Sequence, residues 1–188
     1  MSTENQIENE VKIRLAGIED GLSRLQAAGF VVRRERVFEV NIIYDTPQST
    51  LRNSNSLLRL RQIGSECILT FKGPAEGGRH KTREELETTV GDFGAADAIL
   101  RRLGYAPAFR YEKFRTEFGK DGEPGTVTLD ETPIGVFFEL EGPTEWVDDV
   151  AKRLGFNELD YITESYGSLY MAHCTSLGVP PSDMVFRP

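Results

Sequence analysis

Polar and apolar residues alternate over much of the chain between residues 6 and 142. A repeat of two residues is typical of β-strands whose faces meet different surroundings, because successive side chains of a strand point to opposite sides. Turn-forming stretches that contain Gly or Pro separate several of these segments. The pattern predicts eight strands, over residues 6–15, 36–45, 56–63, 66–72, 81–90, 110–119, 125–130 and 135–142.

Spacings of three and four residues predict helices in other parts of the chain. In the first of them, Ile18, Leu22 and Leu25 share a face, and Gly29 follows as a C-terminal cap. The predicted helices cover residues 18–28, 93–103, 145–154 and 164–177.

The 188 residues are about the length of one domain, and no linker or low-complexity segment divides them. We expect a single domain over 1–188 with its core in about residues 6–170, followed by an irregular tail over 178–188 that contains Pro180 and Pro181. Mainly antiparallel strands with few helical connections predict an α+β fold. Closing the sheet into an eight-stranded, tunnel-like barrel with flanking helices would remove its exposed edges.

The two faces of the predicted strands differ in chemistry. One face is largely apolar, with residues such as Val11, Ile13, Phe138 and Leu140. The other face carries Glu8, Glu10, Lys12, Arg59, Arg61, Lys72, Arg83, Glu85, Glu87, Lys113, Arg115, Asp130, Glu139 and Glu141.

The commonest cause of such alternation is a sheet with its polar face in water. Here, however, the first and last strands pair carboxylates, and the third, fifth and sixth strands present arginine and lysine in pairs. Like charges two positions apart on a strand face lie about 7 Å from each other, which costs stability unless something bridges them. A divalent cation would bridge the carboxylates, and a phosphate chain would bridge the cations.

Charge balance favours an enclosed polar face. Its seven acids and seven bases nearly cancel, although the whole chain carries a formal charge of −8. An eight-stranded barrel has room inside for side chains or one small ligand. A charged lining therefore predicts a tunnel for an extended polyanion with metal, in which Glu8 and Glu10 hold a hard cation and Lys12 meets the anion or a reacting water.

Net charge, apolar runs and cysteine content indicate which partners the protein can bind and in which compartment it lies. A net charge of −8 argues against binding of a nucleic acid polymer. No apolar run is long enough to span a bilayer or to act as a signal peptide, so we expect no membrane partner. Two cysteines without metal-ligand spacing, Cys67 and Cys174, indicate a reducing compartment, so we expect a cytoplasmic protein. Whether it forms a homodimer is left open.

Other candidate chemistry is weak. His80 and His173 have no partner constellation, and no Ser/His/Asp or Cys/His spacing indicates a covalent nucleophile. The stretch GPAEGGRH at 73–80 lacks the P-loop pattern. Tyr166 is expected to pack in the core or at the tunnel end.

An ordered series of motifs resembles the CYTH superfamily, the triphosphate tunnel metalloenzymes. The series begins with ENEVK at 8–12, which fits the family's E-x-E-x-K signature. It continues with YDT at 44–46, LRLR at 58–61, LTFKGP at 69–74, REELE at 83–87, EKFR at 112–115, TLD at 128–130, FELEG at 138–142 and SY at 165–166.

The resemblance implies an eight-stranded tunnel and a set of roles for its residues. Mg²⁺ or Mn²⁺ would be held by Glu8, Glu10, Asp130, Glu139 and Glu141. The triphosphate would be bound by Lys12, Arg59, Arg61, Lys72, Arg83, Lys113 and Arg115. Glu85 and Glu87 would join the metal set or orient arginines. The residues assigned to catalysis are Lys12, Glu10 and Glu139.

Several reactions fit one such site. The first choice is a class IV adenylyl cyclase-like enzyme, which converts ATP to cyclic AMP and pyrophosphate; the alternative is a triphosphatase that acts on inorganic or nucleoside triphosphate. The third is a non-catalytic polyphosphate-binding module. A thiamine triphosphatase is disfavoured because Trp146, the only tryptophan, lies on a predicted helix outside the lining. The cyclase prediction is weakened because no His-Phe dipeptide precedes the E-x-E-x-K signature.

Overall fold

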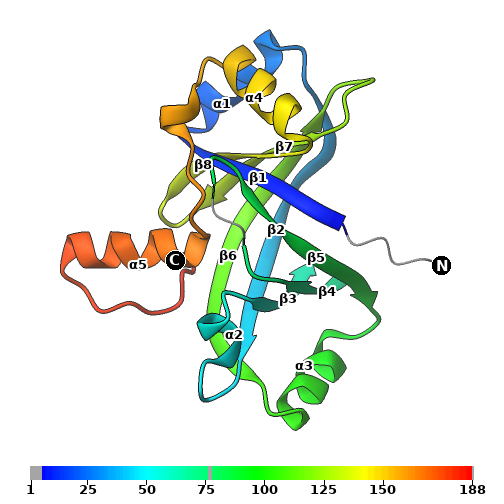
Figure 1. The fold of residues 1–188 in the computed structure, drawn as a ribbon, viewed down its shortest axis with the longest axis vertical. Helices are drawn as coiled ribbons and strands as arrows, with labels where there is room; N and C mark the ends of the chain where they lie inside the picture. The colour runs from blue at the N-terminus through cyan, green and yellow to red at the C-terminus, as the bar shows by residue number, and fades with distance from the viewer. Residues whose placement is uncertain (1–5, 76–77, 188) are drawn as a thin grey trace.

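A computed structural model describes residues 6–75 and 78–187, without the side chains of residues 6–8. In this part of the chain, eight strands close into one antiparallel barrel in the order β1-β5-β4-β3-β2-β6-β7-β8 (Figure 1). The predicted α+β fold with a closed eight-stranded barrel is confirmed. The strands are β1 (Gln6–Leu15), β2 (Val31–Asp45), β3 (Leu57–Ile63), β4 (Glu66–Lys72), β5 (Lys81–Val90), β6 (Ala106–Gly119), β7 (Thr126–Thr132) and β8 (Gly135–Glu141).

Strands β2 and β6 begin earlier than the sequence predicts, at Val31 and Ala106. The two strands pair with each other, and their register shifts between Val32 and Arg34 and again between Arg34 and Val37. Each shift moves the following side chains out of strict alternation, so the period-2 signal is lost where β2 begins.

The helices flank the barrel. The four long ones match their predicted ranges to within two residues at each end. The four-residue α2 and the 3₁₀-helix η1 were not predicted, since a single turn carries no periodic signal. The helices are α1 (Ile18–Ala27), α2 (Thr50–Asn53), α3 (Phe93–Arg102), α4 (Thr144–Arg153), η1 (Glu158–Asp160) and α5 (Tyr166–Leu177).

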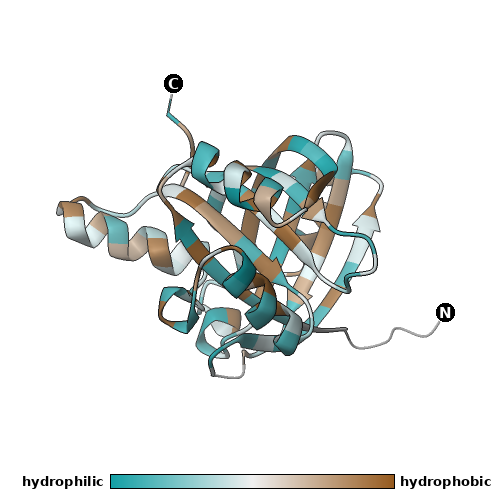
Figure 2. Ribbon diagram, turned by 90° about the horizontal axis from the view of Figure 1, so that it is seen from above, coloured by the Kyte–Doolittle hydropathy of each residue, from teal (hydrophilic) through white to brown (hydrophobic). Residues whose placement is uncertain are grey.

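The main hydrophobic core lies between the outer face of the barrel and the helices. Helices α1 and α4 lie across strands β1, β7 and β8 (Figure 1). There Ile13 and Phe138 pack against Val147 and Val150, all at most 1% exposed. On another side, Leu100 of α3 packs against Leu60 of β3. Figure 2 shows the alternation of apolar and polar residues along the strands beneath these helices.

The opposite face of the strands lines the inside of the barrel. Cross-strand pairing follows the predicted alternation: Lys12 of β1 lies opposite Glu139 of β8, and Arg115 of β6 lies opposite Asp130 of β7. Because a strand pair in register keeps opposite residues on one face, the charged residues of these pairs lie together on the inner face.

Helix α5 projects from one side of the barrel (Figure 1), and the chain then returns to strand β6, where Met184 forms a bridge with Tyr111. Strand β7 pairs with residues 114–118 of β6. Met184 covers an earlier part of the same strand: its N–H donates to Arg110 O and its carbonyl accepts from Glu112 N, both at 2.9 Å. The Met184 side chain is fully buried, so the tail covers an edge of β6 that would otherwise be open.

None of the helices in the described residues has both the length and the apolar character that crossing a membrane requires.

Candidate active site inside the barrel

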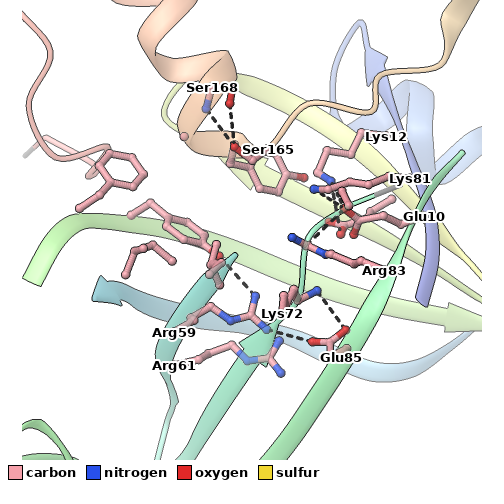
Figure 3. A pocket seen from close by; sticks show the side chains of 18 of the residues that line it. Glu10, Lys12, Arg59, Arg61, Lys72, Lys81, Arg83, Glu85, Ser165 and Ser168 are labelled. Carbon is pink, nitrogen blue, oxygen red and sulfur yellow. Dashed lines mark hydrogen bonds and ion pairs between the residues drawn. The ribbon is translucent and has the colours of Figure 1, made fainter. Parts of the chain in front are cut away.

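A cavity of about 1380 Å³ occupies the interior of the barrel. Figure 3 shows Lys12, Lys81 and Arg83 converging on Glu10, with Arg59 and Lys72 directed toward Glu85. The predicted site residues that line this cavity are Glu10, Lys12, Arg59, Arg61, Lys72, Arg83, Glu85, Glu87, Lys113, Arg115, Glu139 and Glu141.

Two predicted metal ligands, Asp130 and Glu8, are not among the described residues that line the cavity. Asp130 is fully buried and does not contribute to the cavity wall. Glu8 pairs with Arg83 through the β1–β5 register, but its side chain lies outside the described residues.

Three carboxylates from β1 and β8, namely Glu10, Glu139 and Glu141, form what we term the acidic cluster. Glu10 lies opposite Glu141 in the register of the two strands. Lys12 links two members of the cluster, because its Nζ lies 3.0 Å from Glu10 Oε1 and 3.6 Å from Glu139 Oε1. Lys81 Nζ donates to the same Glu10 oxygen at 3.1 Å. Lys12 and Lys81 therefore neutralise part of the negative charge of the acidic cluster.

Opposing effects act on two of these carboxyl groups. Burial would raise the pKa of Glu10, but the charge of Lys12 and further bonds hold that pKa well below its usual value. Burial raises the pKa of Glu141, and the neighbouring charge of Glu139 raises it further. The ionised form of Glu10 is thus stabilised, whereas the ionised form of Glu141 is destabilised by burial and by the charge of Glu139.

The residues of the acidic cluster suit a hard divalent cation. In the described part of the chain, no group of three or more His, Cys, Asp or Glu side chains is arranged to hold a metal ion. The chemistry of the donors nevertheless fits, since Mg²⁺ and Mn²⁺ prefer carboxylate oxygens. A cation at Glu139 and Glu141 would also relieve the repulsion that raises the pKa of Glu141.

Strands β3 and β4 supply a second group, Arg59, Arg61 and Lys72, which we term the basic cluster. Glu85 and Glu87 of β5 face it. Lys72 Nζ lies 3.0 Å from Glu85 Oε2, and Arg61 Nη2 lies 3.2 Å from Glu87 Oε2. In the structure both glutamates thus contact cations of the basic cluster.

Arg59 is held from two strands. Its Nη2 donates to Thr70 Oγ1 at 3.3 Å, and its Nη1 donates to Tyr111 Oη at 3.4 Å. Burial would lower the pKa of Arg59, but Tyr111, Glu85 and Glu87 raise it above its ordinary value. The guanidinium therefore stays charged inside the barrel.

A third set of contacts, which we term the inner network, joins Lys113, Arg115, Asp130 and Tyr166. Asp130 accepts from all three of the others, at 2.6 to 3.0 Å. Arg115 also reaches Glu139 Oε2 at 2.7 Å, which connects the network with the acidic cluster. Burial would raise the pKa of Asp130, but Arg115 and Lys113 hold it far below its usual value.

Some interior residues were not singled out from the sequence. They share the inward parity of their strands, so the alternation of β2 and β5 could have found Glu39, Asn41 and Lys81. Glu39 Oε2 lies 3.6 Å from Lys113 Nζ. The amide of Asn41 is fully buried and makes no hydrogen bond to any described residue.

One part of the cavity wall is apolar and hydroxyl-bearing rather than charged. Ile43 and Phe109 are paired across β2 and β6, and both line the cavity together with Met171 of α5. Ser165 and Ser168, at the start of α5, contribute hydroxyl groups to the same wall (Figure 3). The cavity thus offers a surface for an organic group beside its charged interior.

Comparison with known proteins gives the following likenesses. Residues 6–166 match the family model described as the CYTH domain. The chain is 27% identical over 148 residues to a Methanocaldococcus jannaschii protein named "Putative adenylate cyclase", with 79% of this chain and 83% of the relative covered.

Solved structures share the fold. A Vibrio parahaemolyticus protein, also described as a "putative adenylate cyclase", superposes with a TM-score of 0.77 and 25% identity, covering 88% of this chain and 98% of the other. A Hippeastrum protein described as a "Putative adenylyl cyclase" with a dominant triphosphatase activity superposes with a TM-score of 0.63 and 16% identity, covering 93% and 97%. The second likeness concerns the fold alone.

Proposed function

The chain belongs to the CYTH domain family, and from that premise we propose that it is a divalent-metal-dependent enzyme acting on the triphosphate of a nucleotide. The first assignment is conversion of ATP to cyclic AMP and pyrophosphate. The M. jannaschii and V. parahaemolyticus relatives carry adenylate cyclase names, which favours this reaction.

One observation carries the proposal: a single cavity places the acidic cluster and the basic cluster on different walls of a closed barrel. Phosphoryl transfer needs little covalent help from the protein. It needs the phosphates held in position and their charge neutralised. Cations on several strands, facing one enclosed space, meet both needs.

The guanidinium groups hold the phosphate chain in register. Arg59, Arg61 and Arg115 present planar forks that bind two phosphate oxygens at once, and Lys72 adds a point charge. Lys12 faces the reacting phosphoryl group, with Glu10 and Glu139 holding its ammonium in place. Arg83 and Lys113 complete the binding set.

Glu10, Glu139 and Glu141 would hold Mg²⁺ or Mn²⁺, with Glu8 as a further candidate. When bound, such an ion neutralises charge on phosphate oxygens and orients the phosphate chain.

Cyclisation joins the ribose 3′-oxygen to the α-phosphorus and breaks the bond from that phosphorus to the oxygen that bridges to the β-phosphorus. Pyrophosphate leaves with the bonding pair, and the hydroxyl proton passes to solvent water in the cavity. Lys12, between Glu10 and Glu139, offsets the charge that develops on the phosphate oxygens.

The apolar wall favours an organic triphosphate over inorganic triphosphate. Phe109 stacks on Tyr111 with ring centroids 5.9 Å apart, so a flat ring could extend this stack from the cavity side. Ile43 and Met171 offer further apolar contact. Inorganic triphosphate would leave this wall unused.

A triphosphatase that acts on a nucleoside or inorganic triphosphate is the second candidate. The triphosphatase activity of the Hippeastrum protein, which shares the fold, supports it. In that reaction a water attacks the terminal phosphorus at the same site. A non-catalytic polyphosphate-binding module would use the same cations without turnover.

We also propose a cytoplasmic location for this protein. Cys67 and Cys174 are both buried as free thiols, which agrees with a reducing cytoplasm.

Incubation of the purified protein with ATP, inorganic triphosphate or thiamine triphosphate, each with Mg²⁺ or Mn²⁺, tests the reaction when products are separated by chromatography. Cyclic AMP with pyrophosphate supports the cyclase, and orthophosphate supports the hydrolase. The Glu139→Gln variant should lose turnover by about 10²-fold or more. Undiminished turnover at saturating metal would refute the role of Glu139.

A further inference from the structure

Both carboxylate oxygens of Asp130 in β7 accept hydrogen bonds from side chains of the protein. Arg115 Nε donates to Oδ1 at 2.7 Å and Arg115 Nη2 to Oδ2 at 2.6 Å, so the guanidinium binds both oxygens as a fork. Oδ2 also accepts from Lys113 Nζ at 3.0 Å and from Tyr166 Oη at 2.7 Å. The side chain of Asp130 is 0% exposed.

The partners of Asp130 face the cavity, whereas Asp130 does not. Lys113, Arg115 and Tyr166 all line it. A phosphate that enters the barrel therefore meets the cations, with Asp130 behind them. A metal ion could reach Asp130 only if these close, charge-assisted bonds were broken.

Tyr166 joins this group to the rest of the cavity. It is the first residue of α5, and its ring centroid lies 5.3 Å from Lys12 Nζ and 5.5 Å from Lys113 Nζ. At this distance the ring attracts both ammonium groups. One side chain thus contacts two cations through its ring and, through its hydroxyl, the Asp130 carboxylate that also binds Lys113.

We propose that Asp130 and Tyr166 are positioning residues, which hold Lys113 and Arg115 toward the phosphates from behind, and that Asp130 is not a metal ligand. The proposal rests on the proposed function for the identity of the bound anion. It departs from what family resemblance implies for Asp130.

The physical reason is repulsion between cations. Lys113 and Arg115 lie two positions apart on one strand face, about 7 Å from each other, and would separate without an anion between them. Asp130 lies opposite Arg115 in the β6–β7 register, where it contacts both. Glu39 supports Lys113 from β2 at 3.6 Å.

Two variants separate positioning from metal binding. Asp130→Asn removes the charge, and Tyr166→Phe removes one donor while it keeps the ring. Tyr170→Phe is the matched control: it lies one turn further along α5, and its hydroxyl contacts Ser182 Oγ at 3.1 Å and Asp183 O at 3.2 Å, away from the inner network.

The first measurement is calorimetric binding of inorganic triphosphate in the presence of a chelator, which needs neither metal nor turnover. Both test variants should bind about threefold to tenfold more weakly than the wild type, which corresponds to the loss of part of a charge-assisted hydrogen bond. Tyr170→Phe should bind as the wild type does. Thermal unfolding checks that each variant is folded, and if Asp130→Asn is not, Tyr166→Phe carries the test.

The second measurement is direct Mn²⁺ binding, followed by the electron paramagnetic resonance signal of the free ion. Asp130→Asn should bind Mn²⁺ like the wild type, whereas Glu139→Gln should bind it more weakly. Loss of Mn²⁺ binding in Asp130→Asn with unchanged metal-free triphosphate binding would overturn the proposal, as would a Tyr166→Phe variant that behaves like Tyr170→Phe. If the wild type binds neither triphosphate nor Mn²⁺, the proposed function fails first.

Discussion

Glu10 of β1 lies directly opposite Glu141 of β8, and their carboxyl pKa values are shifted in opposite directions. Burial acts on both groups. Lys12 and Lys81 stabilise the Glu10 anion, whereas Glu139 and Glu85 disfavour the Glu141 anion. The acidic cluster therefore has an unbalanced side at Glu141, where added positive charge would be most favourable.

Glu141→Gln should raise the melting temperature of the metal-free protein near pH 7, because it removes a carboxylate that its neighbours destabilise. The same variant should gain less stability from Mg²⁺ than the wild type gains. Differential scanning calorimetry with chelator and with Mg²⁺ measures both effects. Exposed Glu35→Gln on β2 is the control and should change neither; a Glu141→Gln variant with the full Mg²⁺ effect would contradict a role in metal binding.

Arg59→Lys should weaken triphosphate binding by about tenfold, or about 1.4 kcal/mol, because lysine keeps the charge but loses the planar fork. Isothermal titration calorimetry measures the change. Arg101→Lys serves as control, since this arginine lies on the outer surface of α3 and pairs with Asp97. Equal affinity in the wild type and Arg59→Lys would mean that Arg59 contributes charge alone.

Asp148→Asn should lower stability most at neutral pH. The Asp148 carboxylate of α4 contacts Arg79 at 2.7 Å, His80 at 2.8 Å and Tyr161 at 2.9 Å. Burial would raise the pKa of Asp148, but His80, Tyr161 and Arg79 lower it overall. A lowered pKa in the folded state stabilises the fold above the unfolded pKa of about 3.9, and this contribution is lost as the pH falls through the folded-state value.

Urea unfolding of the wild type and Asp148→Asn checks this sign. The free energy of unfolding should differ by about 1–3 kcal/mol at pH 7, and the difference should shrink once the pH falls below about 3.9. A difference that stays constant down to pH 2 would show that hydrogen-bond geometry, rather than the charge of Asp148, accounts for the effect.

Met184→Ala should destabilise the protein by about 2–4 kcal/mol, since the side chain is fully buried where the tail meets β6. Val179→Ala, earlier in the same tail and 47% exposed, should change stability by about 0.5 kcal/mol or less. Chemical denaturation gives both values. If the two variants proved equally stable, the tail would contribute no packing to the barrel.

Most strands could be predicted because one of their faces is charged and the other is apolar. Lys12 and Glu139 were assigned to the same face from parity alone, and the β1–β8 register places them opposite each other. Closure of the barrel followed from the need to cover sheet edges, which is a general physical constraint.

Parity alone could not show which interior charges neutralise one another. Asp130 and Glu139 are both acids of the inward face, yet one is fully buried among cations and the other lines the cavity. Asp130 is covered by Lys113 and Arg115 of β6 and by Tyr166, which lies 36 positions along the chain from it. Likewise, Glu39 follows the inward parity of β2, but Asn41 and Ile43 beside it are uncharged. The charge pairs that marked other strands therefore gave no reason to single it out.

Most of the apolar packing that stabilises this fold lies on the outer face of the barrel, between the strands and the helices. The charged cavity lies on the inner face of the same strands. Substitutions of cavity residues that favour another anion therefore need not disturb the packing beneath α1, α3 and α4. A designer who wished to change what the barrel accepts could exchange inward residues one register position at a time and use the helical shell as an unchanged scaffold.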